Sequence, residues 1–443
     1  MLYQLDDKLS IQKNIIYALQ HVIYIAISAV AIPIVVAPLL GLNQNEVADV
    51  LQRTFFVSGV LSVLQVKFGH GFPIIEAPAG LWTGILTLMA GLAPTLGKSM
   101  PSLRTDLEGG LLIAGAVIMV IAAAGLIPYL TKLFTPAVNS VLIFLMVLQF
   151  SPSIVKGMLG VMTQDQAVNF KAMAVFFFIV FIILSINLFA KGFLQSISIL
   201  VGIVCGWVLS SILGIGGLMT FSESRFFSMP ELFAWGKPTY SPGIAATCVL
   251  AALLLLSMTY TSINSMADML GQEMTKKKWN RAFLIDGFST VLAGTFPIIA
   301  FMPYISSTGF LAMTGVAART PFLMAGAAMI LMGLIKPVGL FFASIPISVG
   351  CGALIVFFSM ILGQGMKELQ KIKITNRESF VIGIPLIAGI GIMFYPAAFQ
   401  NLPGAFAYIL PNGLVDGIVL AIILDHILPR KQLVSLERNE RLL

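Results

Sequence analysis

Long apolar segments alternate with short polar ones along the whole chain. Most of the apolar segments have about 20 residues, the length that an α-helix needs to cross the hydrocarbon core of a bilayer. Since a spanning helix satisfies its own backbone amides, the pattern predicts an all-α polytopic membrane protein. The fourteen predicted spans are 14–38, 50–66, 73–92, 110–130, 134–153, 169–190, 193–215, 242–267, 281–297, 306–318, 321–335, 339–364, 378–397 and 405–428.

The third and tenth predicted spans differ from the others because each is short and carries Pro or Gly inside. Residues 72–80 read FPIIEAPAG and residues 302–310 read MPYISSTGF, an echo that aligns Pro73 with Pro303. The two copies lie seven spans apart, so they have opposite orientations in the membrane. Paired interrupted spans of this kind indicate the binding site of an inverted-repeat transporter. Their exposed backbone N–H groups can hold an electron-rich ligand.

Composition excludes a water-soluble domain, because 58% of the 443 residues are hydrophobic and 10% are charged, against roughly 25% charged residues in soluble domains. Eighteen of the 26 Lys and Arg residues fall in the tails and loops of one predicted side, which the positive-inside rule makes cytoplasmic. We therefore expect a multi-pass inner-membrane protein with both termini in the cytoplasm and no cleavable signal peptide. The net charge of +7 then reflects topology, and no nucleic-acid partner is expected.

Three local patterns together resemble the nucleobase–ascorbate transporter family, also called the nucleobase:cation symporter-2 family. Gln20-His21 lies in the first span, and Asp286-Gly287-Phe288-Ser289-Thr290 lies in the ninth. The tenth span carries residues 306–316, SSTGFLAMTGV, followed by Arg319, where the family has its signature Q/E/P-N-x-G-x-x-x-x-T-R/G. The resemblance covers nearly the whole chain in length and in number of spans.

The resemblance implies fourteen spans arranged as two inverted repeats of seven, with short strands in spans 3 and 10. The substrate would lie between these strands. Spans 1–4 and 8–11 would form a core domain, made of residues 1–133 and 242–337. Spans 5–7 and 12–14 would form a gate domain, made of residues 134–241 and of residues 338–443, which include the cytoplasmic tail.

The chain departs from the family pattern at several positions that bind substrate in the family. Ser306 and Ser307 stand where the signature has Gln or Glu and Asn, and Met258 stands where span 8 usually has Glu. Conversely, Glu76 occupies span 3, where the family usually has a neutral residue. A carboxyl group in the middle of a membrane is costly unless it is paired, hydrated or protonated, and such groups are usually functional.

The candidate residues therefore form two groups, and no catalytic or metal-binding residue is expected, since the three histidines are scattered and the cysteines lie in apolar segments. His70 and His426 are expected to be solvated at cytoplasmic helix ends. The coupling or supporting residues are His21, Gln20, Asp286 and Thr314. The substrate-binding residues are Glu76, Ala77, Pro78, Ala79, Met258, Thr259, Tyr260, Ser306, Ser307, Thr308 and Gly309.

The function that fits these features is import of a purine or pyrimidine base by alternating access, driven by H⁺ or Na⁺, with no other cofactor. A homodimer is possible, and the expected partners are the nucleobase and the lipid bilayer. The alternatives are an anion transporter of the sulfate-permease-like fold group and a passive channel. A membrane-embedded enzyme is not expected, because the sequence has no cluster of His or Asp residues at one membrane face and no nucleotide-binding or nucleophile motif.

The charge distribution predicts the topology directly. Reporter enzymes fused at Arg438 and within residues 216–241 should report opposite sides of the membrane, with the C-terminal fusion in the cytoplasm. A periplasmic C-terminus, or two reporters on the same side, would contradict the fourteen-span prediction.

Overall fold

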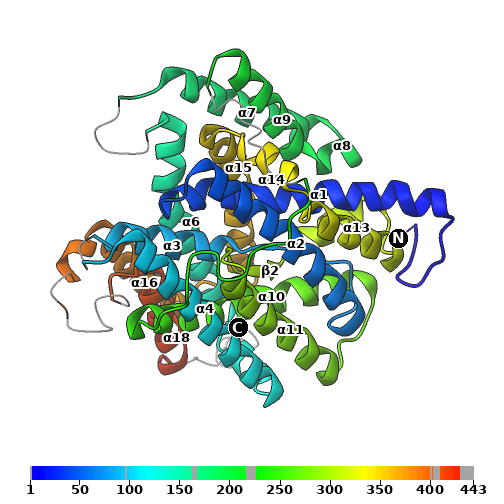
Figure 1. The fold of residues 1–443 in the computed structure, drawn as a ribbon. Helices are drawn as coiled ribbons and strands as arrows, with labels where there is room; N and C mark the ends of the chain where they lie inside the picture. Colours follow the sequence, from blue (N-terminus) through cyan, green and yellow to red (C-terminus); the bar gives the residue numbers. More distant parts are fainter. Residues whose placement is uncertain are drawn as a thin grey trace.

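The computed structural model describes residues 2–94, 97–161, 167–215, 226–399, 402 and 410–429. The described chain is a bundle of helices that surrounds one short strand pair (Figure 1). The first half contains α1 (Ile11–Leu39), α2 (Gln44–Phe68), β1 (Glu76–Pro78), α3 (Gly80–Leu92), α4 (Met100–Ala123), α5 (Ile127–Thr131), α6 (Pro136–Leu159), α7 (Phe170–Phe189), α8 (Phe193–Ser196) and α9 (Ser198–Ile212). The second half contains α10 (Pro242–Leu270), α11 (Lys276–Thr295), β2 (Phe301–Pro303), α12 (Ser306–Thr314), α13 (Arg319–Met332), α14 (Lys336–Ala343), α15 (Ile347–Gln370), α16 (Asn376–Phe394), the 3₁₀ turn η1 (Pro396–Phe399) and α18 (Gly413–Ile427).

Within the described residues, eight helices are long and apolar enough to cross a membrane: α1, α2, α4, α6, α7, α10, α15 and α16. Three shorter apolar helices, α3, α9 and α13, add to them. Every one of the fourteen predicted ranges overlaps a helix, although the start of the last range, 405–409, lies outside the described residues. The prediction of a polytopic helical protein is confirmed, while the number of spans stays a prediction.

The interruption predicted in spans 3 and 10 is present in both. A three-residue strand precedes a short helix in each, β1 before α3 and β2 before α12. β1 lies inside the predicted range of span 3, whereas β2 lies just before residue 306, where span 10 was predicted to begin. The strands end at Pro78 and at Pro303. Pro78 therefore corresponds to Pro303, and the alignment of Pro73 with Pro303 from the sequence echo was wrong by five residues. The echo matched Pro73, which lies in the loop before β1, to Pro303, which ends β2.

Two close helix crossings show the same internal symmetry. A Cβ atom added at Gly59 of α2 would lie 2.5 Å from the carbonyl oxygen of Gly326 in α13. In the same way, a Cβ at Gly115 of α4 would lie 2.6 Å from the carbonyl oxygen of Gly287 in α11. Glycines let spanning helices approach to backbone contact. An inverted repeat relates span 2 (α2) to span 9 (α11) and span 4 (α4) to span 11 (α13). It therefore maps the α2–α13 crossing onto the α11–α4 crossing.

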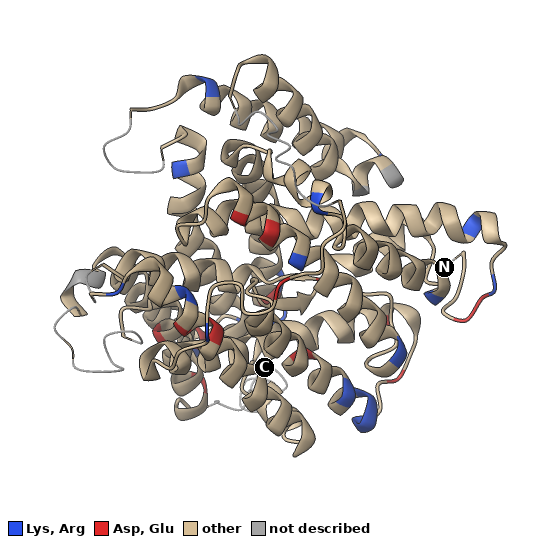
Figure 2. Ribbon diagram, in the orientation of Figure 1, with Lys and Arg blue, Asp and Glu red and all other residues tan. Residues whose placement is uncertain are grey.

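Helix packing divides into two groups, and the strand pair lies against helices of the first. In one group α2 packs against α1, α13 and α14, and α4 packs against α10 and α11. In the other, α6 packs against α15, α16 and α18, and α7 packs against α9 and α15. Contacts of α3 with α6 and of α1 with α15 join the groups. The division into core and gate domains at the stated boundaries remains a prediction. Charged residues are sparse along the bundle, and a run of Lys residues opens α11 (Figure 2).

Candidate functional site

The strand pair joins the two interrupted spans in an antiparallel arrangement. Glu76 lies opposite Pro303, Ala77 opposite Met302 and Pro78 opposite Phe301. All three residues of each strand are buried. Both strands pack against helices, since α1 and α2 contact β1, and α10 and α11 contact β2. The prediction that the two broken spans meet is therefore confirmed, and they meet inside the protein.

Further hydrogen bonds link the ends of the two broken spans. The N–H of Ala79 donates to the carbonyl of Ala300 over 2.8 Å, and the N–H of Tyr304 donates to the carbonyl of Ile75 over 2.9 Å. The hydroxyl of Tyr304 donates to the carbonyl of Pro78 over 2.6 Å. Backbone groups at this depth need such partners, because an unpaired one in an apolar interior costs several kcal/mol.

Two serines complete the connection. The side chain of Ser307 accepts a hydrogen bond of 3.0 Å from the N–H of Ile75, so the first turn of α12 holds the chain just before β1. The hydroxyl of Ser58 in α2 donates to the carbonyl of Glu76. Ala77 and Ser307 both lie at this junction and are buried.

The two half-helices begin directly beside the strands. Ala79 is the N-cap of α3, and α12 begins at Ser306, three residues after β2 ends. The N-terminus of a helix carries a partial positive charge and unpaired N–H groups. Ser306 is partly exposed and Gly309 is exposed, with open space around its Cα. The face of α12 that carries these two residues can therefore contact a ligand.

Two buried carboxyl groups lie in this region. Glu76 is 1% exposed, and its Oε1 has no hydrogen-bond partner among the described residues. Asp286 of α11 is also buried, and its Oδ2 accepts a hydrogen bond of 3.3 Å from the Thr259 hydroxyl of α10. The carboxyl group of Asp286 interacts electrostatically with Glu76. Two carboxylates in one buried site repel each other, so a proton carried by one of them relieves the repulsion.

His70, expected to be solvated, is instead buried beside Glu76. Its Nε2 lies 3.7 Å from Oε1 of Glu76, and its Nδ1 accepts a 3.0 Å hydrogen bond from the N–H of Phe72. The N–H groups of Gly69 and Gly71 both donate to the carbonyl of Gln65, so the chain turns at the end of α2, and His70 is 1% exposed. The sequence placed His70 correctly near the end of a helix but gave no signal of its burial.

An aromatic group from α1, α12 and α13 lies next to the junction. The ring of His21 is buried between Phe310 and Phe322, at centroid distances of 5.3 and 5.2 Å. Tyr24 stacks on Phe310 at 4.4 Å. His21 therefore packs against Phe310 of α12, in the broken span 10. Its Nδ1 has no hydrogen-bond partner among the described residues.

Three other predicted residues are partly buried. Met258 is partly buried in the apolar core of the bundle. Thr308 is partly buried, and its hydroxyl has no partner among the described residues. Gln20 is partly buried in α1, one position from His21.

Two predicted residues point elsewhere. Tyr260 is 37% exposed and stacks on Trp279 at 4.6 Å, so the contacts of its ring are with α11 and not with the strands. The hydroxyl of Thr314 donates to the carbonyl of Phe310 within the last turn of α12. Thr314 thus supports its own helix, at the end of α12 that lies away from the strand pair. Two residues that the sequence did not single out also hold the strand pair, Tyr304 through Pro78 and Ser58 through the carbonyl of Glu76.

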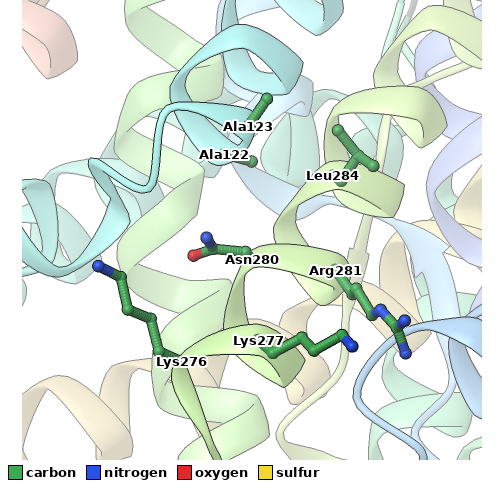
Figure 3. Close-up of a pocket in the computed structure, with 7 residues that line it drawn as sticks. All are labelled: Ala122, Ala123, Lys276, Lys277, Asn280, Arg281 and Leu284. Atoms are coloured by element: carbon green, nitrogen blue, oxygen red, sulfur yellow. The ribbon is translucent and has the colours of Figure 1, made fainter.

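A surface pocket of about 460 Å³ lies away from the strands, at the ends of α4 and α11 (Figure 3). Figure 3 shows Lys276, Lys277, Asn280 and Arg281 along α11 and the small side chains of Ala122 and Ala123 opposite. None of the predicted site residues lines it. Its basic side chains belong to the lysine-rich start of α11, which the positive-inside rule already explains.

Sequence comparisons relate almost the whole chain to known transport proteins. The profile of the Permease family that takes in xanthine and uracil permeases matches residues 12–398. The YwdJ protein of Bacillus subtilis (strain 168) is 32% identical over 429 residues, which cover 93% of this chain and 95% of that one. The uric acid transporter UacT of Escherichia coli (strain K12) is 26% identical over 430 residues, covering 95% and 87%. The xanthine permease of Bacillus subtilis (strain 168) is 23% identical over 418 residues, covering 93% of each chain.

Structural comparison identifies the same fold in transporters of low sequence identity. The transmembrane domain of the cyanobacterial bicarbonate transporter BicA has a TM-score of 0.60 at 16% identity, covering 95% of this chain and 100% of that one. The murine Slc26a9 anion transporter in the inward-facing state has a TM-score of 0.64 at 12% identity, covering 95% and 69%. At these identities the two neighbours show that the chain shares their fold.

The hydrogen bond from Tyr304 to Pro78 predicts a specific cost. Replacing Tyr304 by Phe keeps the ring and leaves the buried Pro78 carbonyl without its donor, so the protein should lose roughly 1–3 kcal/mol of stability. Thermal unfolding of the detergent-solubilised protein measures this as a fall in Tm of several degrees. Tyr395→Phe, at an exposed position, serves as the control and should leave Tm unchanged. Equal Tm values for Tyr304→Phe and the wild type would mean that this bond does not hold the broken spans together.

Proposed function

Since this chain belongs to the xanthine/uracil permease family, whose members are transport proteins and not enzymes, we propose that it is a secondary active transporter that imports a nucleobase. The match over residues 12–398 is the observation that carries the proposal. It confirms the resemblance to the nucleobase–ascorbate transporter family found from the sequence motifs. Its apolar helices and the family together make the chain a multi-pass membrane protein.

The substrate class that we favour is a purine base. Relatives over nearly the full length include a xanthine permease and a uric acid transporter. The planar edge of a purine offers both hydrogen-bond donors and acceptors, which suit the backbone groups and half-helix N-termini at the strand pair. Ser306 and Ser307 would replace the amide and carboxyl side chains of the family signature. Because Ser307 is buried and Ser306 is partly exposed, Ser306 is the better candidate for direct contact with the base.

Coupling to a cation would use the buried carboxyl groups. Glu76 and Asp286 interact in the buried centre of the protein, where one negative charge is costly and two are costlier. Binding of a proton to Glu76 would relieve this repulsion before the substrate site changes sides. Proton symport is therefore our proposal, and sodium symport is the alternative that the same uptake assay tests.

Alternating access would move the core domain against the gate domain. The contact between α3 and α6 is one place where they would slide, and there the side-chain amide of Gln149 donates to the carbonyl of Gly84 over 3.2 Å. We further propose that the protein lies in the cell inner membrane with both termini cytoplasmic, as its Lys and Arg distribution favours. A homodimer is compatible with the fold.

The alternative of an anion transporter has support from the fold alone, through the bicarbonate transporter BicA. Two buried carboxyl groups beside the strand pair oppose the binding of a compact anion by charge repulsion. The sequence relatives are matched at higher identity and over as much of the chain. Nucleobase transport is thus the better supported function.

Uptake of a labelled panel tests the proposal. Cells that lack their own nucleobase permeases would express the protein and be given radiolabelled uracil, xanthine, hypoxanthine, guanine, adenine or urate. We expect accumulation of at least one purine above the external concentration, and its loss when a protonophore collapses the proton gradient. Accumulation that depends on external sodium would show that sodium, and not the proton, is the coupling ion. Equilibration without accumulation would favour a channel, and bicarbonate uptake without any base would favour the anion alternative.

The role of Glu76 gives a separate prediction. Glu76→Gln keeps the size of the side chain but cannot exchange a proton, so the variant should still exchange external for internal substrate at a rate within about threefold of the wild type. Accumulation against a gradient should fall at least about tenfold, since the driving ion is no longer carried. The measurement is exchange and net uptake in the same proteoliposomes.

The control for this experiment is Glu273→Gln, which changes an exposed carboxyl group between α10 and α11 in the same way. It should behave like the wild type. A folded Glu76→Gln protein that still concentrates substrate with the same pH dependence would remove Glu76 from the mechanism and leave Asp286 as the carrier.

A further inference from the structure

The hydrogen bonds of His70 fix the position of its proton. Its Nδ1 accepts from the backbone N–H of Phe72 over 3.0 Å, so this nitrogen carries no proton. The imidazole is then neutral, with its one N–H at Nε2. That N–H is buried, and it has no hydrogen-bond acceptor among the described residues.

The nearest group to this free donor is the carboxyl group of Glu76. Nε2 and Oε1 are 3.7 Å apart, and neither atom has another partner in the described part of the chain. A hydrogen bond between N and O needs about 2.7–3.2 Å. The two atoms are therefore slightly too far apart for a hydrogen bond, and a small rotation of either side chain would close the gap. A carboxylate would attract this donor more strongly than a protonated carboxyl group does.

The loop that carries His70 is held from another span. The Nε of Arg319, at the start of α13, donates to the carbonyl of Gly71 over 2.7 Å, and the same guanidinium forms an ion pair with Asp6. Arg319 thus fixes the chain one residue after His70. The position of the imidazole is therefore set by α2, which ends just before His70, and by α13, which carries Arg319.

A basic pocket of about 410 Å³ borders this loop. It is lined by residues 69–71 of the loop together with Lys67, Lys278, Arg281 and Arg319, on the side that the charge distribution makes cytoplasmic. Four cationic groups around one pocket create a positive potential that favours departure of a proton and the presence of a nearby carboxylate.

The titratable and charged groups around the pair come from several elements. On α11 Asp286 interacts electrostatically with Glu76, and it is the group that opposes a second negative charge. The cationic groups that line the pocket beside the pair are Lys67 of α2, Lys278 and Arg281 of α11, and Arg319 of α13, and the hydroxyl of Tyr304 donates to Pro78 of β1.

We propose that His70 is a positioning residue for coupling, a neutral Nε2–H donor that stabilises the ionised form of Glu76 when the site faces the cytoplasm. The proposal rests on the proposed function, in which Glu76 carries the proton. In this step the O–H bond of the Glu76 carboxyl group breaks and the proton passes to water in the basic pocket. The carboxylate that remains accepts the hydrogen bond from His70. The imidazole itself neither gains nor loses a proton.

Two substitutions separate the two hydrogen bonds of His70. In His70→Asn the amide oxygen can take the place of Nδ1 and accept from Phe72, but the side chain is too short to reach Glu76. In His70→Gln the amide nitrogen can take the place of Nε2 and donate to Glu76, while the acceptor for Phe72 is lost. His426→Gln, at an exposed position on α18, is the control for the chemical change alone.

The experiment measures net uptake against pH, and substrate exchange at equal pH on both sides, in proteoliposomes with a purine that the wild type accumulates. We expect His70→Asn to keep exchange within about twofold, to lose net uptake about tenfold, and to shift the pH of half-maximal uptake upward by about one unit. His70→Gln and His426→Gln should match the wild type. Exchange does not require proton release, so it reports folding and substrate binding separately from coupling.

Several results would overturn the proposal. If His70→Asn matched the wild type and His70→Gln were impaired, the role of His70 would be to accept the hydrogen bond from Phe72 and not to donate to Glu76. Equal impairment of both would mean that the imidazole itself titrates, and two unimpaired variants would leave His70 without a role in coupling. Loss of exchange together with net uptake in His70→Asn would assign the residue to folding. A wild type that accumulates no purine would instead refute the proposed function, and the role of His70 with it.

Discussion

The need to pair every backbone N–H and C=O inside the membrane governs this structure. Two spans are interrupted by prolines, and each interruption frees backbone groups that a continuous helix would have paired. The two interruptions satisfy each other, through the antiparallel pairing of β1 with β2 and through the bonds that continue it at Ala79 and Tyr304. Neither broken span can keep its form without the other.

This mutual dependence also creates the site. Because the strands are short, α3 and α12 begin beside them, and two helix N-termini approach one point inside the protein. Glu76 lies on a strand of this pair, whereas the family usually places its carboxyl group on span 8, here Met258. Asp286, held by Thr259, supplies the second carboxyl group. We infer that the coupling carboxyl group has moved to a neighbouring element and serves the same site.

Much of the fold could be predicted from the sequence, because hydropathy and proline position act locally. Each predicted range overlaps a helix, the range of span 3 contains β1, and β2 lies just before the predicted start of span 10 at residue 306. The register of the repeat could not be predicted, since Pro73 and Pro78 are equally plausible partners of Pro303 until the strands are seen. The burial of His70 depends on a loop that Arg319 holds from 248 residues away. The orientation of Tyr260 toward Trp279 likewise depends on packing between helices.

The most direct test of the account is the position of the substrate. Cryo-electron microscopy of the protein with the purine that it accumulates should show the base at the junction of β1, β2 and the first turns of α3 and α12, within hydrogen-bond distance of backbone N–H or C=O groups. Density for the base only in one of the basic pockets at the ends of α2 and α11, with the strand pair unoccupied, would contradict the account.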